Sequence, residues 1–73
     1  MKAMDLHIYP SKDNKFRATH CNNSISLYVN ISRELLVNDL RTDHNYDRYN
    51  IVIHNIDGSI DNIIPAVDNG ETN

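Results

Sequence analysis

The segment ISLYVNISRELLVNDLRT, residues 25–42, decides the fold, because its hydrophobic period changes at Ser32. Up to that point apolar and polar side chains alternate, which is the pattern of a half-buried β-strand. The alternating apolar residues of this strand are Ile25, Leu27, Val29 and Ile31. Beyond Ser32 the apolar spacing becomes helical, so the segment predicts a strand that leads directly into a helix.

The predicted helix has a defined beginning and end. Ser32 can cap the N-terminus by accepting a hydrogen bond from a free backbone amide of the first turn. Ile31 and Leu36 then occupy the positions of a hydrophobic staple. We expect the helix to end near Thr42, with Asn45 in a left-handed cap conformation. The apolar face is expected to consist of Leu36, Val37 and Leu40, with Leu35 at its margin.

Further strands are expected on both sides of this segment. Upstream, residues 6–9 and 15–20 alternate and should form an antiparallel meander with residues 25–31. Downstream, residues 49–54 and 60–64 read as a second hairpin, and Pro65 ends it or places it at an edge. The order β-β-β-α-β-β predicts an α+β fold, with a small, mainly antiparallel sheet and one helix packed on one face. We expect residues 1–67 to form one domain and residues 68–73 to be a mobile tail.

Length and composition limit the class of protein. A chain of 73 residues buries only roughly 60% of its unfolded surface, so the core must be thin. With 40% hydrophobic residues and no long apolar run, neither a disordered nor a membrane protein is expected. Cys21 is the single cysteine, which excludes an intrachain disulfide and a multi-thiolate zinc site. A cytoplasmic location fits this count.

The net charge of −3 is unevenly distributed along the chain. Residues 1–37 contain five basic and three acidic side chains, giving +2. Residues 38–73 contain two basic and seven acidic side chains, giving −5. The second half of the chain can therefore attract a partner of opposite charge, although surface acid also serves solubility.

The sequence HNIDGSID, residues 54–61, resembles part of a calcium-binding loop. With Gly58 at the sixth position, oxygen ligands fall at positions 3, 5 and 9. The first and twelfth positions are Ile53 and Ile64, which have no side-chain oxygen. The stretch therefore predicts a hairpin turn in which Gly58 supplies a positive φ.

No group of residues in the sequence predicts catalysis. None of the four histidines forms an i, i+4 pair, and the polar run from Asp43 to Asp47 reads as a solvated loop after a helix. Two glycines cannot build a phosphate-binding loop, and no nucleophile motif is present. We expect a protein that is not an enzyme and has neither a metal nor a cofactor.

Protein binding is the leading functional hypothesis. A short acidic domain, rich in asparagine and isoleucine, resembles the accessory proteins of bacteriophages and mobile elements, which commonly block a host macromolecule by occupying its surface. The expected partner is a larger protein, such as a nucleic-acid-binding protein whose basic groove the acidic half would cover. Acidic residues and two interface-forming tyrosines make up the expected contact, namely Asp39, Asp43, Tyr46, Asp47, Tyr49, Asp57 and Asp61.

Two alternatives remain open. A basic and aromatic N-terminal sheet could bind nucleic acid through Lys12, Lys15, Arg17 and Tyr28, although the acidic net charge argues against it. The chain could also be a structural subunit that forms a homodimer through an exposed strand edge.

Overall fold

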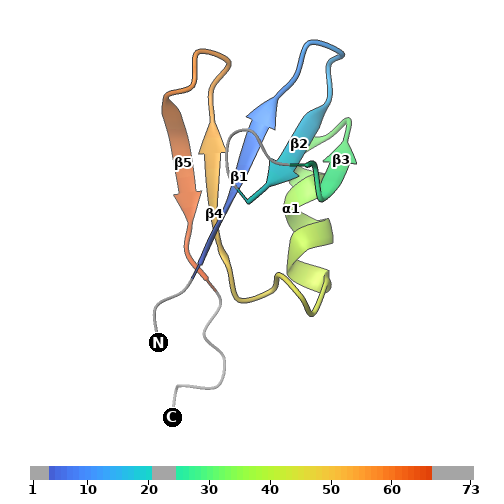
Figure 1. Ribbon diagram of the computed structural model, residues 1–73, viewed down its shortest axis with the longest axis vertical. Coiled ribbons are helices and arrows are strands. Elements are labelled where there is room, and N and C mark those ends of the chain that lie inside the picture. Colours follow the sequence, from blue (N-terminus) through green and yellow to red (C-terminus); the bar gives the residue numbers. More distant parts are fainter. Residues whose placement is uncertain (1–3, 21–24, 67–73) are drawn as a thin grey trace.

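The computed structural model describes residues 4–20 and 25–66 as five strands and one helix (Figure 1). The predicted α+β fold and its element order are confirmed. The predicted tail lies outside the described residues. The elements are β1 (Asp5–Pro10), β2 (Phe16–Thr19), β3 (Tyr28–Asn30), α1 (Arg33–Thr42), β4 (Asn50–His54) and β5 (Ile60–Ile64).

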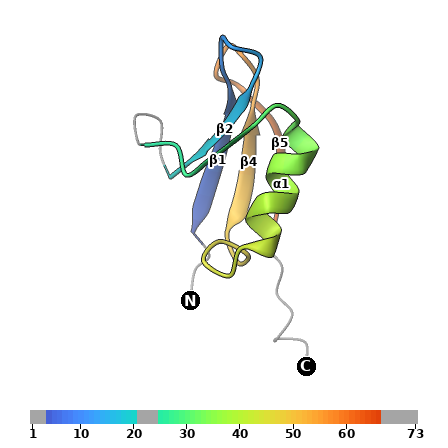
Figure 2. The same cartoon turned by 90° about the vertical axis from the view of Figure 1, so that its right-hand side faces the viewer.

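The strands form one sheet in the order β3-β2-β1-β4-β5. The expected meander is present, because β1 pairs with β2 and β2 with β3, both antiparallel. The central pair, β1 and β4, is parallel, and β5 pairs antiparallel with β4. Helix α1 covers one side of the sheet (Figure 2), where it contacts β2 and β3. Within the described residues, no helix has the length and apolar character needed to cross a membrane.

The core lies between α1 and the sheet. Leu36 and Leu40 from the helix are fully buried, as the helical spacing predicts. They belong to one apolar cluster with residues from three strands, namely Leu6, Ile8, Ala18, Ile51 and Ile53. Because each of these strands sends alternate side chains to this side, the opposite side carries the other set.

The start of the helix follows the prediction only in part. Ser32 is the N-cap, and its hydroxyl accepts a hydrogen bond from the backbone amide of Leu35 at 3.3 Å. The predicted staple is wrong, because Ile31 is 72% exposed while Leu36 is buried in the core. The predicted left-handed cap at Asn45 is also wrong, because the helix ends on Asp43 in an extended conformation.

The strand predicted over residues 25–31 is shorter than expected and faces the other way. Tyr28 pairs with Ala18, whose side chain lies in the core, so Tyr28 also packs against the core. Val29 is therefore exposed, and Ile25 is exposed as well. Leu27 does pack against the core. The pattern identified the strand but not its buried face, because the pairing with β2 determines which side chains meet the helix.

The turn between β4 and β5 is as predicted. Gly58 has a φ of 92°, and its amide donates a hydrogen bond to the carbonyl of Asn55 at 2.9 Å. The amide of Asn55 donates to the carbonyl of Ser59 at 2.8 Å, which closes the turn. The DG dipeptide is thus a hairpin turn at the end of the sheet away from the loop after α1 (Figure 1).

Candidate functional site in the loop after the helix

Residues 43–49, which we call the acidic loop, connect the end of α1 to the start of β4. Four of the seven residues predicted to contact a partner lie in this loop, namely Asp43, Tyr46, Asp47 and Tyr49. A fifth, Asp39, lies on the helix one turn before the loop. The structure therefore brings five of the predicted residues to one end of the molecule.

Arg41 holds the acidic loop against the rest of the protein. Its guanidinium donates hydrogen bonds to the backbone carbonyls of Tyr49 at 2.7 Å and Asp47 at 3.2 Å. It also donates to the carbonyls of Pro65 at 2.8 Å and Ile64 at 3.5 Å, where β5 ends. Burial lowers the pKa of Arg41 and nearby Asp47 raises it, and the guanidinium stays charged at neutral pH. One side chain thus joins the helix, the loop and the last strand.

Asp43 fixes the beginning of the loop through both carboxylate oxygens. The Tyr28 hydroxyl donates to Oδ2 at 2.6 Å, and the backbone amide of Asn45 donates to Oδ1 at 2.9 Å. These hydrogen bonds, that of Tyr28 foremost, lower the pKa of Asp43. The same bond raises the pKa of Tyr28, because ionising the phenol would place two negative charges together.

Tyr46 and Tyr49 form the aromatic part of the site. The amide of Tyr46 donates to the carbonyl of Asp43 at 2.9 Å, and the amide of Tyr49 to the carbonyl of Tyr46 at 3.1 Å, which makes consecutive turns. Their ring centroids lie 5.6 Å apart with planes tilted by 66°, a favourable edge-to-face arrangement. His20 contacts both rings and Tyr28 contacts the ring of Tyr46, and both rings of the pair are half-buried.

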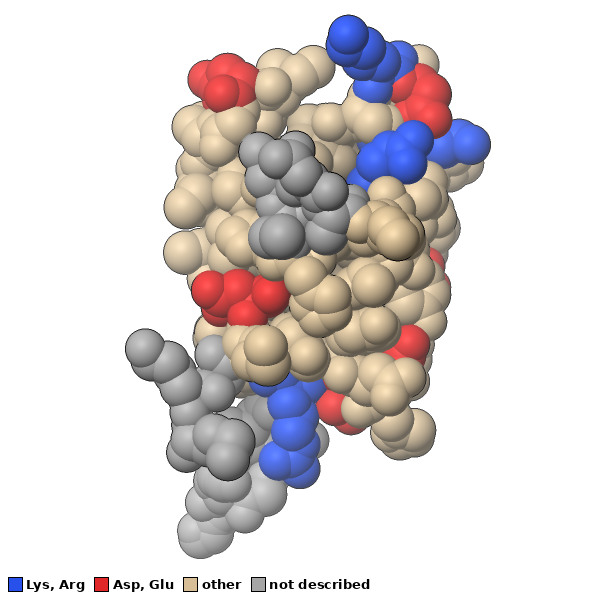
Figure 3. Space-filling model, viewed as in Figure 1, with Lys and Arg blue, Asp and Glu red and all other residues tan. Residues whose placement is uncertain are grey.

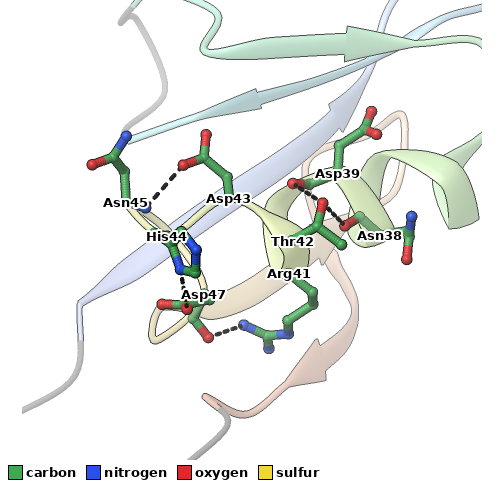
Figure 4. A network of polar contacts seen from close by, with 8 residues as sticks. All are labelled: Asn38, Asp39, Arg41, Thr42, Asp43, His44, Asn45 and Asp47. Atoms are coloured by element: carbon green, nitrogen blue, oxygen red, sulfur yellow. Dashed lines mark hydrogen bonds and ion pairs between the residues drawn. The ribbon is translucent and has the colours of Figure 1, made fainter.

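Asp47 is the carboxylate of the loop with the weakest internal contact. Its Oδ2 lies 3.7 Å from Nδ1 of His44, whose side chain is 99% exposed. Such an exposed pair contributes little to stability. By contrast, Asp39 accepts a hydrogen bond from Nδ2 of Asn30 at 3.2 Å. Figure 4 shows the Asp47 carboxylate beside His44 and away from Asp39 and Asp43.

The other two predicted residues lie elsewhere. Asp57 accepts hydrogen bonds from the amide of Ser59 at 2.9 Å and from its hydroxyl at 2.6 Å, so it stabilises the β4–β5 turn, and these bonds lower its pKa. Asp61 forms an ion pair with Arg33 at 3.1 Å, beside the first turn of α1. Neither residue adjoins the acidic loop, and both carboxylates already have partners.

The residues of the nucleic-acid alternative are also divided. Lys12 and Lys15 lie in the β1–β2 turn, and Arg17 follows in β2, where it pairs with Tyr9 and lies 3.6 Å from Asp13. Figure 3 shows Lys and Arg side chains gathered at this end of the molecule. Tyr28 is not with them, because its ring packs against the core and its hydroxyl is bonded to Asp43.

Sequence reasoning did not find two features. An arginine in the last turn of a helix indicates only a favourable charge for the helix dipole, so the four carbonyl contacts of Arg41 could not be foreseen. His7 and His54 are 47 residues apart, yet their rings touch because β1 and β4 pair in parallel. No family model, curated protein or solved structure matches this chain.

Proposed function

We propose that this chain is a non-enzymatic protein-binding domain that modulates or inhibits a larger partner by covering part of that partner's surface with the acidic loop and Asp39. The observation that supports this proposal most directly is the set of hydrogen bonds that hold the loop in one conformation. Arg41 and Asp43 hold its backbone through three hydrogen bonds, to the carbonyls of Asp47 and Tyr49 and from the amide of Asn45, and three more join these two side chains to Tyr28, Ile64 and Pro65. A loop that is ordered in advance loses little conformational entropy on binding.

The chemistry of the loop favours a basic protein surface as partner. The loop carries Asp43, Asp47 and the exposed Arg48, and Asp39 lies beside it on α1, while the guanidinium of Arg41 is directed to carbonyls inside the fold. Half-buried tyrosine rings next to carboxylates suit an interface, because tyrosine provides contact area with little loss of side-chain freedom. A groove that binds nucleic acid is one surface of the required charge, and occlusion of such a groove would inhibit its owner.

Asp47 provides the test, because its side chain can be changed without removing a strong internal contact. Its carbonyl, which accepts from Arg41, is retained in any substitution. Asp47→Lys should weaken capture of the partner at least tenfold, since a negative contact becomes a positive one. Glu34→Lys is the matched control, because it makes the same charge change in the first turn of α1, at the other end of the helix.

The measurement is affinity capture from a lysate of the source cells, with quantitative identification of the retained proteins. A protein enriched by the wild type and by Glu34→Lys, but not by Asp47→Lys, would then be purified and its affinity for the three chains measured. If every captured protein binds Asp47→Lys as tightly as the wild type, the acidic loop is not the contact surface.

Nucleic-acid binding through Lys12, Lys15 and Arg17 is a second candidate, favoured by their common position in the β1–β2 turn and the start of β2. Tyr9 takes the place of Tyr28 as the neighbouring aromatic residue, since it pairs directly with Arg17. A mobility-shift titration with single-stranded oligonucleotides at low and high salt checks this function, because phosphate contacts weaken steeply as salt rises. The absence of a shift at low salt would remove this candidate.

A further inference from the structure

His7 and His54 form a pair on the side of the sheet opposite α1. The register places His7 beside Val52, so His54 is its diagonal neighbour on the same face of the next strand. Nδ1 of His7 lies 2.9 Å from Nε2 of His54, and the ring centroids are 5.1 Å apart. Both side chains are half-buried, so the pair is held by the sheet yet open to solvent.

The other nitrogen of His54 determines which ring atoms are free. Nδ1 of His54 lies 3.1 Å from the carbonyl oxygen of Gly58, and a carbonyl can only accept, so Nδ1 carries the proton. Nε2 of His54 therefore presents a lone pair toward His7. A ring N–H bonded to a backbone carbonyl is the usual support of a metal-binding histidine, because it fixes the tautomer and raises the basicity of the ligating nitrogen.

We infer that His7 Nδ1 and His54 Nε2 form a binding site for a divalent transition-metal ion, with Cu²⁺ bound most tightly. Two nitrogens bound to one ion at about 2.0 Å lie about 2.8 to 3.3 Å apart, depending on the angle between them. The observed separation of 2.9 Å is within this range. His7 needs only to carry its proton on Nε2, which frees Nδ1 to bind the ion.

The surroundings restrict the movement of the pair. Tyr9 stacks on His54 with centroids 4.3 Å apart and planes inclined by 10°, which limits rotation of the His54 ring. Among the described residues, no three His, Cys, Asp or Glu side chains converge on one point. The two imidazoles would therefore be the protein ligands, and water or another molecule would complete the coordination. Imidazole ligands favour Cu²⁺ over Ni²⁺ and Zn²⁺ in affinity.

The experiment is a titration of the metal-free full chain with CuCl₂, followed by electron paramagnetic resonance. All chains carry Cys21→Ser, because a free thiol can bind or reduce the ion. The expected result is one bound Cu²⁺ per chain with hyperfine coupling to imidazole nitrogen. His7→Gln and His54→Gln should each lower the affinity at least tenfold, whereas His44→Gln and His20→Gln should leave it unchanged.

A second measurement does not depend on the variants folding. It uses the proton NMR spectrum of the chain that retains all four histidines. Substoichiometric Cu²⁺ should broaden the imidazole resonances of His7 and His54 before it broadens those of His44 and His20. Unselective broadening, or binding that persists in the His7→Gln, His54→Gln double variant, would overturn the inference. The pair would then be a structural hydrogen bond that shares one proton. This site lies on the sheet, so its failure would leave the proposal for the acidic loop untouched.

Discussion

At the scale of single residues, Arg41 joins parts of the chain that lie up to 24 residues apart. Replacing it with methionine keeps the apolar stem but removes all four hydrogen bonds to carbonyls. We expect Arg41→Met to lower the free energy of unfolding by about 2 kcal/mol, because charged hydrogen bonds are strong but this side chain is partly exposed. Urea denaturation measures this change.

The control for Arg41 is Arg48, an exposed arginine in the acidic loop that follows α1. Arg48→Met should change the free energy of unfolding by less than about 0.5 kcal/mol, as surface substitutions usually do. Equal effects of the two substitutions would show that Arg41 acts only through its charge and not through the carbonyls that it contacts.

The bond between Tyr28 and Asp43 predicts how stability depends on pH. It lowers the pKa of Asp43 from 3.8, so its contribution to stability is present above that value and is lost as pH falls through the lowered pKa. It raises the pKa of Tyr28 from 10.0, so that contribution is present below pH 10.0 and is lost as pH rises further.

Tyr28→Phe removes this hydrogen bond and keeps the ring. The variant should be less stable than the wild type near pH 7, and the difference should shrink toward low pH, where Asp43 is protonated in both chains. Urea denaturation at several pH values from 2 to 7 measures the difference. A difference that stays constant over this range would mean that the hydroxyl does not act through the Asp43 carboxylate.

At the scale of elements, the helix was predictable because its signals are local. Ser32, the apolar spacing and the last turn all lie within one short segment, and the observed helix agrees with them. Strand β3 was predictable only as a strand. Its buried face depends on the pairing of Tyr28 with Ala18, which is 10 residues away in the sequence, and alternation is the same whichever face is buried.

Two adjacent leucines test how α1 is oriented. Leu36 is fully buried, whereas Leu35 is 54% exposed. Leu36→Ala should lower the free energy of unfolding by about 3 kcal/mol, because it loses buried apolar area and leaves a cavity. Leu35→Ala should change it by less than about 0.5 kcal/mol. Urea denaturation of both variants compares them in the same helix, and equal losses would contradict the observed orientation.

At the scale of the whole molecule, the predicted acidic surface is divided by the topology. Strand β4 carries the chain from the acidic loop to the turn that contains Asp57, and five residues of strand span about 17 Å. Acidic residues before and after β4 therefore cannot share one small contact site. The sequence shows the charge of each half, but the direction of β4 decides where that charge lies.

The strand edges bear on the hypothesis of self-association. Strand β5 is an edge of the sheet, and three features make it a poor template for another strand. Oδ1 of Asn62 accepts a hydrogen bond from the amide of Ile63 at 2.9 Å, so this donor already has a partner. Pro65 has no amide hydrogen, and the register between β4 and β5 is irregular at Ile53 and His54.

We therefore expect the wild-type chain not to associate through β5 and the double variant Asn62→Val, Pro65→Val to do so, because it gains free backbone donors and an apolar side chain at this edge. Asn38→Val is the control, since it adds the same side chain on the exposed surface of α1. Sedimentation velocity across a hundredfold dilution series measures the association. A concentration-dependent dimer of the wild type, unchanged in the double variant, would mean that association does not depend on these features of β5 and would support the structural-subunit alternative.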